Sequence, residues 1–207
     1  PEKDLLKAWL LLSHYQYPDL DIGSIALQIE QIAKKIWIGL NDNLTPLEKI
    51  RLINHILFEV HGYKGNVRNF HAPQNSFISD VLNNKKGNPL SLSLLYLIIA
   101  QKCELPIKGV NLPKHFVIAY THEELYEGDP VKFYINPFSQ GTILSRQDLE
   151  RFVEKEKLEL KTKFFSPCGN RAIIRRLLTN LLHSYSIQGN KEKAEEIQKF
   201  LQLFKTK

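Results

Sequence analysis

Two polar side chains stand at the ends of predicted strands and could cooperate in acid–base chemistry. His115 opens an apolar and aromatic run that ends at Tyr120, and Asn136 closes a second run that begins at Val131. Both runs have the composition of strands. Upstream of them, an apolar helix is predicted to begin near Asn88. A helix start followed by a strand His and a strand Asn suits nucleophilic catalysis, in which the imidazole is the base and the amide orients it.

The stretch GNPLSLSLLYLIIAQKC, from Gly87 to Cys103, is apolar on every side of a helix. A helix of this kind belongs in a protein core. It is too short to span a bilayer, which needs about 20 apolar residues. The sequence therefore predicts a buried central helix. Free backbone N–H groups gather at the start of a helix, together with the positive end of its dipole, so Asn88 is a candidate binding residue.

Further helices are predicted before and after this stretch, and the strands follow it. Apolar periodicity predicts helices over about residues 2–15, 24–40, 45–61, 75–84, 170–187 and 191–204, and another that begins at Ser145. Strands are predicted over residues 107–112, 115–120, 131–136 and 158–165. Residues 123–130 form a predicted acidic loop or turn, and residues 166–169 a predicted linker or turn.

Three motifs and the tail carry a family resemblance. NSFISDVL, GNPLSLSLLYLIIAQKCELPIKGVNLPKHFVIAY and FYINPFSQG follow one another in this order. They resemble the bacterial SirB-type proteins of the transglutaminase-like superfamily, and a similar region appears in some eukaryotic F-box proteins. The tail NRAIIRRLLTNLLHSYSIQGNKEKAEEIQKFLQL resembles the tetratricopeptide-like end of the same proteins. The resemblance covers most of the chain from about Asn75 onward.

The resemblance implies an α+β fold with a transglutaminase-like (papain-like) core. In such a core the buried central helix packs on a small antiparallel sheet, with a helical N-terminal part and a C-terminal helical hairpin. The implied division is residues 1–166 for the transglutaminase-like domain with its N-terminal helices, and residues 167–207 for a tetratricopeptide-like hairpin packed on it. A single hairpin of this size cannot bury its own apolar face, so it must pack on the rest of the chain or on a partner.

The resemblance also places the family's catalytic triad on this chain and reveals a gap in it. The strand His corresponds to His115, and its partner to Asn136, where transglutaminases usually have Asp. The nucleophilic Cys corresponds to Pro89 or, with a shift of one residue, to Leu90, and neither side chain can attack a substrate. Ser91, in the first turn of the helix, is the remaining candidate nucleophile, although a serine there also serves as a helix cap.

Neither cysteine fills this gap directly. Cys103 lies about 21 Å from the helix start at 1.5 Å per residue, and a buried thiol there is expected to pack as a small hydrophobe. Cys168 lies in a predicted turn and is a less favoured candidate for a displaced nucleophile. That role requires a lowered thiol pKa.

Composition narrows the class of protein. Hydrophobic residues make up 43% and charged residues 24% of the 207 residues, which is ordinary for a soluble globular protein. Two cysteines do not make a disulfide framework, and no signal peptide opens the sequence, so we expect a protein of the reducing cytoplasm. The histidines show no paired metal spacing and the glycines no phosphate loop. We therefore expect no cofactor, no metal and no membrane partner.

Three functions remain open. The favoured hypothesis is a non-catalytic module that binds or regulates a protein or peptide, with Arg171 and Arg175 of the Arg171–Arg176 cluster as candidates for holding an acidic partner. The second is a hydrolase or acyltransferase that uses Ser91, or Cys168, with His115 and Asn136. The third and least favoured, prompted by the net charge of +6, is a nucleic-acid-associated protein whose binding weakens steeply with salt.

Overall fold

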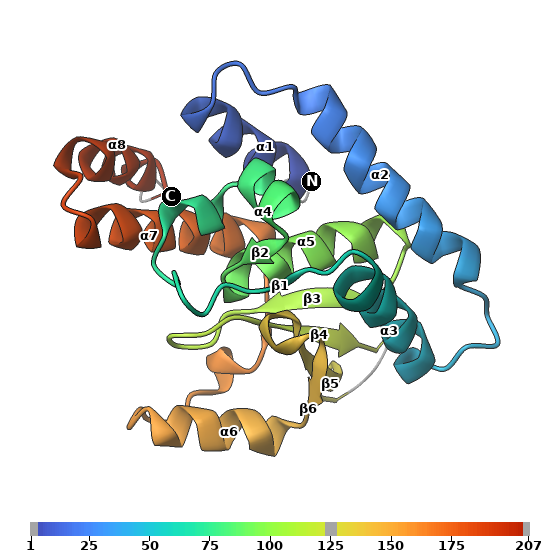
Figure 1. Ribbon diagram of the computed structural model, residues 1–207. Coiled ribbons are helices and arrows are strands. Elements are labelled where there is room, and N and C mark those ends of the chain that lie inside the picture. Colours follow the sequence, from blue (N-terminus) through green and yellow to red (C-terminus); the bar gives the residue numbers. More distant parts are fainter. Residues whose placement is uncertain (1–3, 123–127, 205–207) are drawn as a thin grey trace.

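In the computed structural model, which describes residues 4–122 and 128–204, one helix runs through the middle of the molecule. This helix, α5 (Pro89–Lys102), has N-terminal helices on one side and a sheet on the other (Figure 1). All residues from Pro89 to Ala100 are buried. A helix without a polar face can be stable only in such a place, because it has no side to turn toward water. The predicted buried central helix is confirmed.

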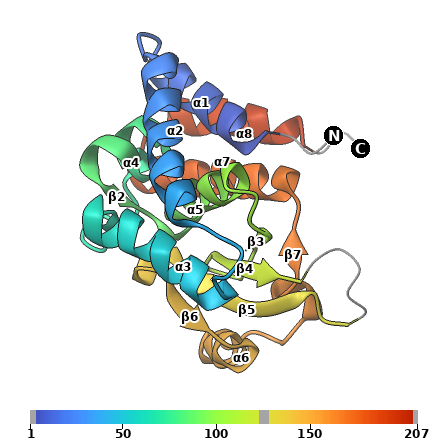
Figure 2. The same ribbon diagram turned by 90° about the vertical axis from the view of Figure 1, so that its right-hand side faces the viewer.

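The other helices lie around α5 and beyond the sheet (Figures 1 and 2). They are α1 (Leu5–Gln16), α2 (Ile22–Gly39), α3 (Pro46–Asn54), α4 (Ile78–Asn84), α6 (Arg146–Lys155), α7 (Asn170–Ile187) and α8 (Lys191–Gln202). Short helical turns cover His55–Val60, Pro73–Ser76, Pro137–Ser139 and Thr162–Phe164. Within the described residues, no helix has the length and apolar character needed to cross a membrane.

The sheet has five antiparallel strands in the order β6-β5-β4-β3-β7. They are β3 (Ile107–Val110), β4 (Val117–Thr121), β5 (Val131–Asn136), β6 (Thr142–Leu144) and β7 (Pro167–Cys168). A separate parallel pair joins β1 (Lys64–Gly65) to β2 (Lys86–Gly87), directly before α5. Helices around a small antiparallel sheet confirm the predicted α+β class.

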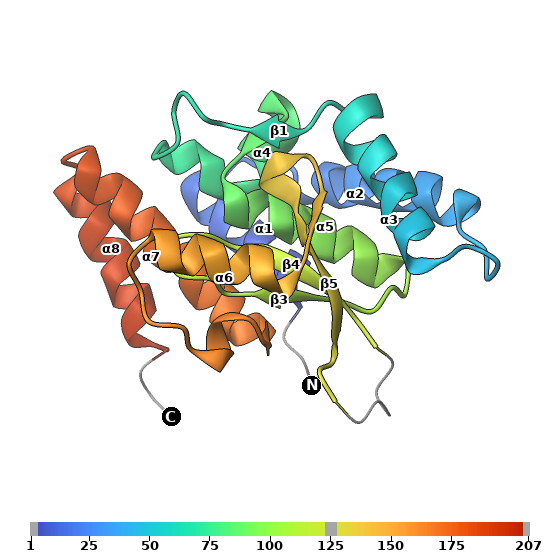
Figure 3. The ribbon, with the colours of Figure 1, turned by 90° about the horizontal axis from the view of Figure 1, so that it is seen from below.

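Each face of the sheet contributes to a different hydrophobic cluster. Along β4, Ile118 and Tyr120 lie in the large cluster that contains α5, whereas Val117 and Ala119 lie in a second cluster with Leu149 of α6. The alternation follows from the period of two along a strand. Figure 3, which views the molecule from below, shows α6 on the face of the sheet opposite α5. The sheet is thus covered by helices on both faces.

Two strand predictions need correction, and one expectation lies outside the described residues. The strand predicted over residues 158–165 is wrong, because this segment follows α6 and forms a helical turn at Thr162–Phe164. The strand that pairs with β3 on the side away from β4 is β7, further along the chain. His115 does not open a strand, because β4 begins only at Val117, after Lys114 has taken a left-handed conformation with φ 58°. Residues 123–127 of the predicted acidic loop lie outside the described residues.

The predicted C-terminal helical hairpin is present as α7 and α8, which lie side by side (Figures 1 and 3). Ile173, Leu177 and Leu181 of α7 and Ile197 of α8 are buried in the same cluster as α5. The hairpin therefore buries its apolar face on the rest of the chain. Its likeness to a tetratricopeptide unit, and the division at residues 166 and 167, stay predictions.

A side-chain network ties α3 and α5 to the turn after β5. The Asn54 amide donates to the carbonyl oxygen of Gly141 at 2.9 Å, and its oxygen accepts from the Tyr96 hydroxyl at 3.1 Å. Gly141 in turn donates its backbone N–H to the carbonyl oxygen of Asn136 at 2.9 Å. Gly141 has φ +74°, and a Cβ atom there would lie 2.1 Å from Oδ1 of Asn54. This turn has no room for a side chain.

Gly141→Ala is therefore expected to lower the free energy of unfolding by at least about 2 kcal/mol, because a strained φ is combined with an overpacked contact. Gly189→Ala is the matched control, since Gly189 has φ +72° but no atom within 4 Å of the place that a Cβ would take. The control should lose only about 1 kcal/mol, the conformational cost alone. Urea unfolding of both variants measures the difference, and equal losses would contradict the steric account.

Candidate functional site

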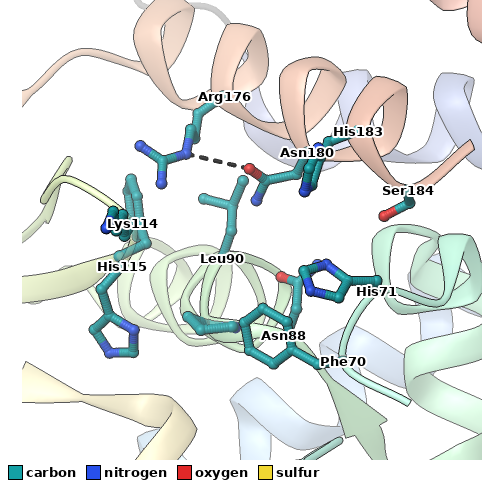
Figure 4. Close-up of a pocket in the computed structure, with 12 residues that line it drawn as sticks. Phe70, His71, Asn88, Leu90, Lys114, His115, Arg176, Asn180, His183 and Ser184 are labelled. Atoms are coloured by element: carbon teal, nitrogen blue, oxygen red, sulfur yellow. Dashed lines mark hydrogen bonds between the residues drawn. The ribbon is translucent and has the colours of Figure 1, made fainter. Parts of the chain in front are cut away.

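A cavity of about 410 Å³ lies where the start of α5 meets α7 and the segment before β4 (Figure 4). The start of α5 supplies Asn88, Pro89 and Leu90, and α7 supplies Arg176, Asn180, His183 and Ser184. The rest of the wall comes from Lys114, His115 and Phe116 and from Phe70 and His71. Its volume is within the range of small-ligand and peptide-side-chain pockets.

The start of α5 is fixed by a buried capping box. Oδ1 of Asn88 accepts a hydrogen bond from the Ser91 backbone N–H at 2.9 Å, and Oγ of Ser91 accepts one from the Asn88 backbone N–H at 2.9 Å. The Ser91 hydroxyl also lies 3.3 Å from the Asn88 carbonyl oxygen, to which it can donate. Ser91 is fully buried and does not line the cavity. Its hydroxyl is thus used to satisfy the helix start.

The predicted pairing of His115 with Asn136 is present. Nε2 of His115 lies 3.3 Å from Oδ1 of Asn136, and Nδ2 of Asn136 donates to the Ser139 hydroxyl at 3.2 Å. Because the amide oxygen can only accept, Nε2 carries the proton in neutral His115, and Nδ1 holds the lone pair. The imidazole also contacts Phe138 and Phe152, with ring centroids 6.3 and 5.6 Å away. These rings and the amide hold the imidazole in one orientation.

Burial lowers the pKa of His115 below its ordinary value. The hydrogen bond to Asn136 opposes this shift, and the positive charge of Arg176 adds to it. The imidazole is therefore neutral at pH 7. A neutral imidazole with a free Nδ1 lone pair is chemically able to accept a proton.

The candidate nucleophiles from the sequence do not line this cavity, and the hydroxyl that does is that of Ser184, on α7. Pro89 and Leu90, which the family resemblance places at the nucleophile position, line the wall with carbon side chains only. Cys168 borders a different hollow, between Leu5 and Ile173, and Cys103 is buried near the end of α5 with its thiol 3.6 Å from the Ala33 carbonyl oxygen. Burial raises the pKa of both thiols to about 11.

The wall formed by α7 was not predicted from the sequence. Arg171 and Arg175 are exposed and border a second hollow, where the Arg171 guanidinium donates to the Phe204 carbonyl oxygen at 3.1 Å. The cavity is lined by Asn180 of the same helix, and Arg176 borders both hollows. Their spacing of four residues, continued by His183 and Ser184, places them on one face and was the available sequence signal.

The described residues do not form a metal centre: no three His, Cys, Asp or Glu side chains among them are grouped so that they could hold an ion. His71 and His183 face each other with ring centroids 5.4 Å apart. They approach edge to face and form one end of the cavity (Figure 4).

Comparison with known proteins gives relatives of two kinds. A UPF0162 protein of Xylella fastidiosa is 28% identical over 189 residues, 88% of this chain and 65% of the relative. A UPF0162 protein of Vibrio cholerae is 24% identical over 182 residues, 86% of this chain and again 65% of that protein. F-box only protein 21 of Mus musculus is 27% identical over 134 residues, 63% of this chain and 21% of that protein.

The chain thus spans 65% of the length of these two bacterial relatives. No solved structure matches it significantly. The sequence profile of the Transglutaminase-like superfamily matches residues 24–179, which include α5, the sheet and, of the α7 wall, Arg176. The chain belongs to the transglutaminase-like superfamily.

Proposed function

We propose that this protein is a non-catalytic module that binds a protein or peptide in the cavity between α5 and α7. One observation carries the proposal: His115, paired with Asn136, lines the cavity together with Pro89 and Leu90, which the family resemblance places at the nucleophile position. The His–Asn pair of the family is kept, while the place of the family's thiol sulfur is taken by carbon atoms. A site of this kind retains the shape for a peptide without the means to cleave or acylate it.

The chemistry of the alternative nucleophiles supports a binding role. The Ser91 hydroxyl is buried in hydrogen bonds to the Asn88 backbone, so its use as a nucleophile requires the helix start to give up its cap. A thiol with a pKa of about 11 is almost entirely protonated at pH 7, and only the thiolate attacks. A hydrolase or acyltransferase that uses Ser91 or Cys168 is therefore less favoured.

The relatives are consistent with a module that acts within larger proteins. F-box only protein 21 carries the similar region in a chain of which this match covers 21%. We extend the proposal to a SirB-type bacterial protein of the cytoplasm, with α7 and α8 as a tetratricopeptide-like tail. The tail supplies one wall of the cavity, so the two parts would bind a partner together.

The proposal predicts that the native protein resists covalent labelling. A fluorophosphonate should not label Ser91, and iodoacetamide at pH 7 should modify the cysteines far more slowly than an unperturbed thiol, by roughly a hundredfold for a pKa raised by two units. Intact-protein mass spectrometry measures both, and urea-unfolded protein is the positive control for the thiols. Stoichiometric labelling that disappears in His115→Ala would overturn the proposal.

The protonation of His115 gives a second prediction. Its pKa, followed by NMR of the imidazole Cε1–H signal, should lie below the ordinary value of about 6.5. Arg176→Gln should raise it by removing a like charge, whereas Arg171→Gln, on an exposed part of the same helix, should leave it unchanged. A pKa above the ordinary value would contradict the buried, neutral imidazole.

The lowered pKa of His115 also determines the direction in which the free energy of unfolding changes with pH. Because the folded state binds this proton more weakly than the unfolded state, the His115 contribution to the free energy of unfolding is complete above about pH 6.5. It decreases as the pH falls through the interval between the unfolded and folded pKa values. Urea unfolding from pH 7 to 5 should show this decrease in the native chain and a smaller slope in His115→Gln.

A further inference from the structure

The polar groups around the cavity are mostly hydrogen-bond donors. Oδ1 of Asn88 is occupied by the Ser91 N–H, and Oδ1 of Asn180 by Nε of Arg176, 3.2 Å away. Each amide therefore has its NH₂ group left over, and no described residue accepts from either one. Asn88 is only 7% exposed and lines the cavity, so a ligand bound there could accept a hydrogen bond from its NH₂ group.

Arg176 supplies a cation without an anionic partner. Its Nη1 donates to Oδ1 of Asn111 at 2.9 Å and to the Leu112 carbonyl oxygen at 3.3 Å, and these bonds, with the one from Nε, fix the guanidinium. Nη2 keeps two N–H groups, and no carboxylate among the described residues forms an ion pair with Arg176. No Asp or Glu lines the cavity in the described part of the chain.

The surface beside these donors is apolar. Pro89, Leu90, Phe116 and Phe70 line the cavity. Figure 4 shows Leu90 beside Arg176 and Asn180, and Phe70 further from them. A ligand that fits must therefore bring acceptor oxygens, a negative charge and a neighbouring apolar group. A phosphate would meet the first two requirements but has no apolar neighbour fixed to it, whereas a peptide carboxylate next to an apolar side chain meets all three.

We propose that the cavity binds a peptide carboxylate beside an apolar side chain, held by Nη2 of Arg176 and the side-chain NH₂ groups of Asn180 and Asn88. This inference rests on the proposed peptide-binding function and specifies its ligand. The rigid guanidinium and the two oriented amides are arranged before the ligand arrives, so little ordering is needed on binding. The terminal carboxylate of a peptide ending in an apolar residue fits this description best.

Three small probes test the chemistry. The first is N-acetyl-leucine, which has a terminal carboxylate and an apolar side chain; the second is its neutral amide, N-acetyl-leucinamide. The third is the α-amide of N-acetyl-glutamate, whose only carboxylate is in the side chain. Titration into the ¹⁵N-labelled protein, followed through the Asn NH₂ and Arg Nε–H signals, should show binding of N-acetyl-leucine with Kd on the order of 1 mM. The neutral amide should bind at least about tenfold more weakly.

Two matched variants test whether the ligand carboxylate is bound beside position 180. Asn180→Asp keeps the shape of the side chain and the acceptor for Arg176 but replaces the NH₂ donor by a charged oxygen, so it should weaken N-acetyl-leucine binding at least about tenfold. Gln188→Glu makes the same amide-to-carboxylate change at an exposed position at the end of α7 that lines neither hollow, and it should change the affinity by less than about threefold at 0.15 M salt. Unfolding midpoints of both variants show that the fold is kept.

The outcomes separate the two proposals. Binding of the glutamate compound instead of N-acetyl-leucine would support the carboxylate and assign it to an acidic side chain. Equal binding of the acid and its amide, or an unchanged affinity in Asn180→Asp, would overturn the carboxylate inference while peptide binding in the cavity remained. The absence of any shift at about 20 mM of each probe would also overturn the inference, because this concentration is well above the Kd expected for such small ligands. Failure of the proposed function itself would appear separately, in the covalent labelling experiment.

Discussion

The start of α5 is buried, and its free backbone N–H groups must find acceptors inside the protein. Asn88 and Ser91 provide them through reciprocal hydrogen bonds, each 2.9 Å long. The close packing leaves no space at Gly87, where a Cβ atom would lie 2.5 Å from Oγ of Ser91. The parallel pair β1–β2 brings Gly87 to this place. The requirement to satisfy one helix end therefore determines which side chains remain free at the cavity.

The His115–Asn136 pair is positioned by elements of the sheet and its turns. Asn136 is held at the end of β5 by the turn through Gly141, and His115 by the approach to β4. These constraints belong to the sheet and do not depend on what stands at the start of α5. The residues at positions 89 and 90 therefore do not set the orientation of the imidazole. Function in such a frame depends on the particular side chains that meet at the site.

The sequence was informative where one physical signal dominated. The apolar α5 and the strand β5, Val131–Asn136, were predicted correctly because their composition leaves little alternative. The segment 158–165 has strand-like composition, but its place beside β3 is taken by β7, and no local pattern reveals which segment pairs. The α7 wall was missed for the same reason: Arg176 and Asn180 meet His115 only through the packing of distant elements.

The two edge strands of the sheet are very short. β6 has three residues and β7 two, and β7 contains Pro167, which has no backbone N–H to donate. Such short edge strands leave few unpaired backbone groups with which an added strand could pair, and this protects the protein against edge-to-edge aggregation. They also remove the most common way in which a sheet captures an extended polypeptide. An extended polypeptide would accordingly find few unpaired backbone groups with which to continue the β-ladder at either edge of this sheet.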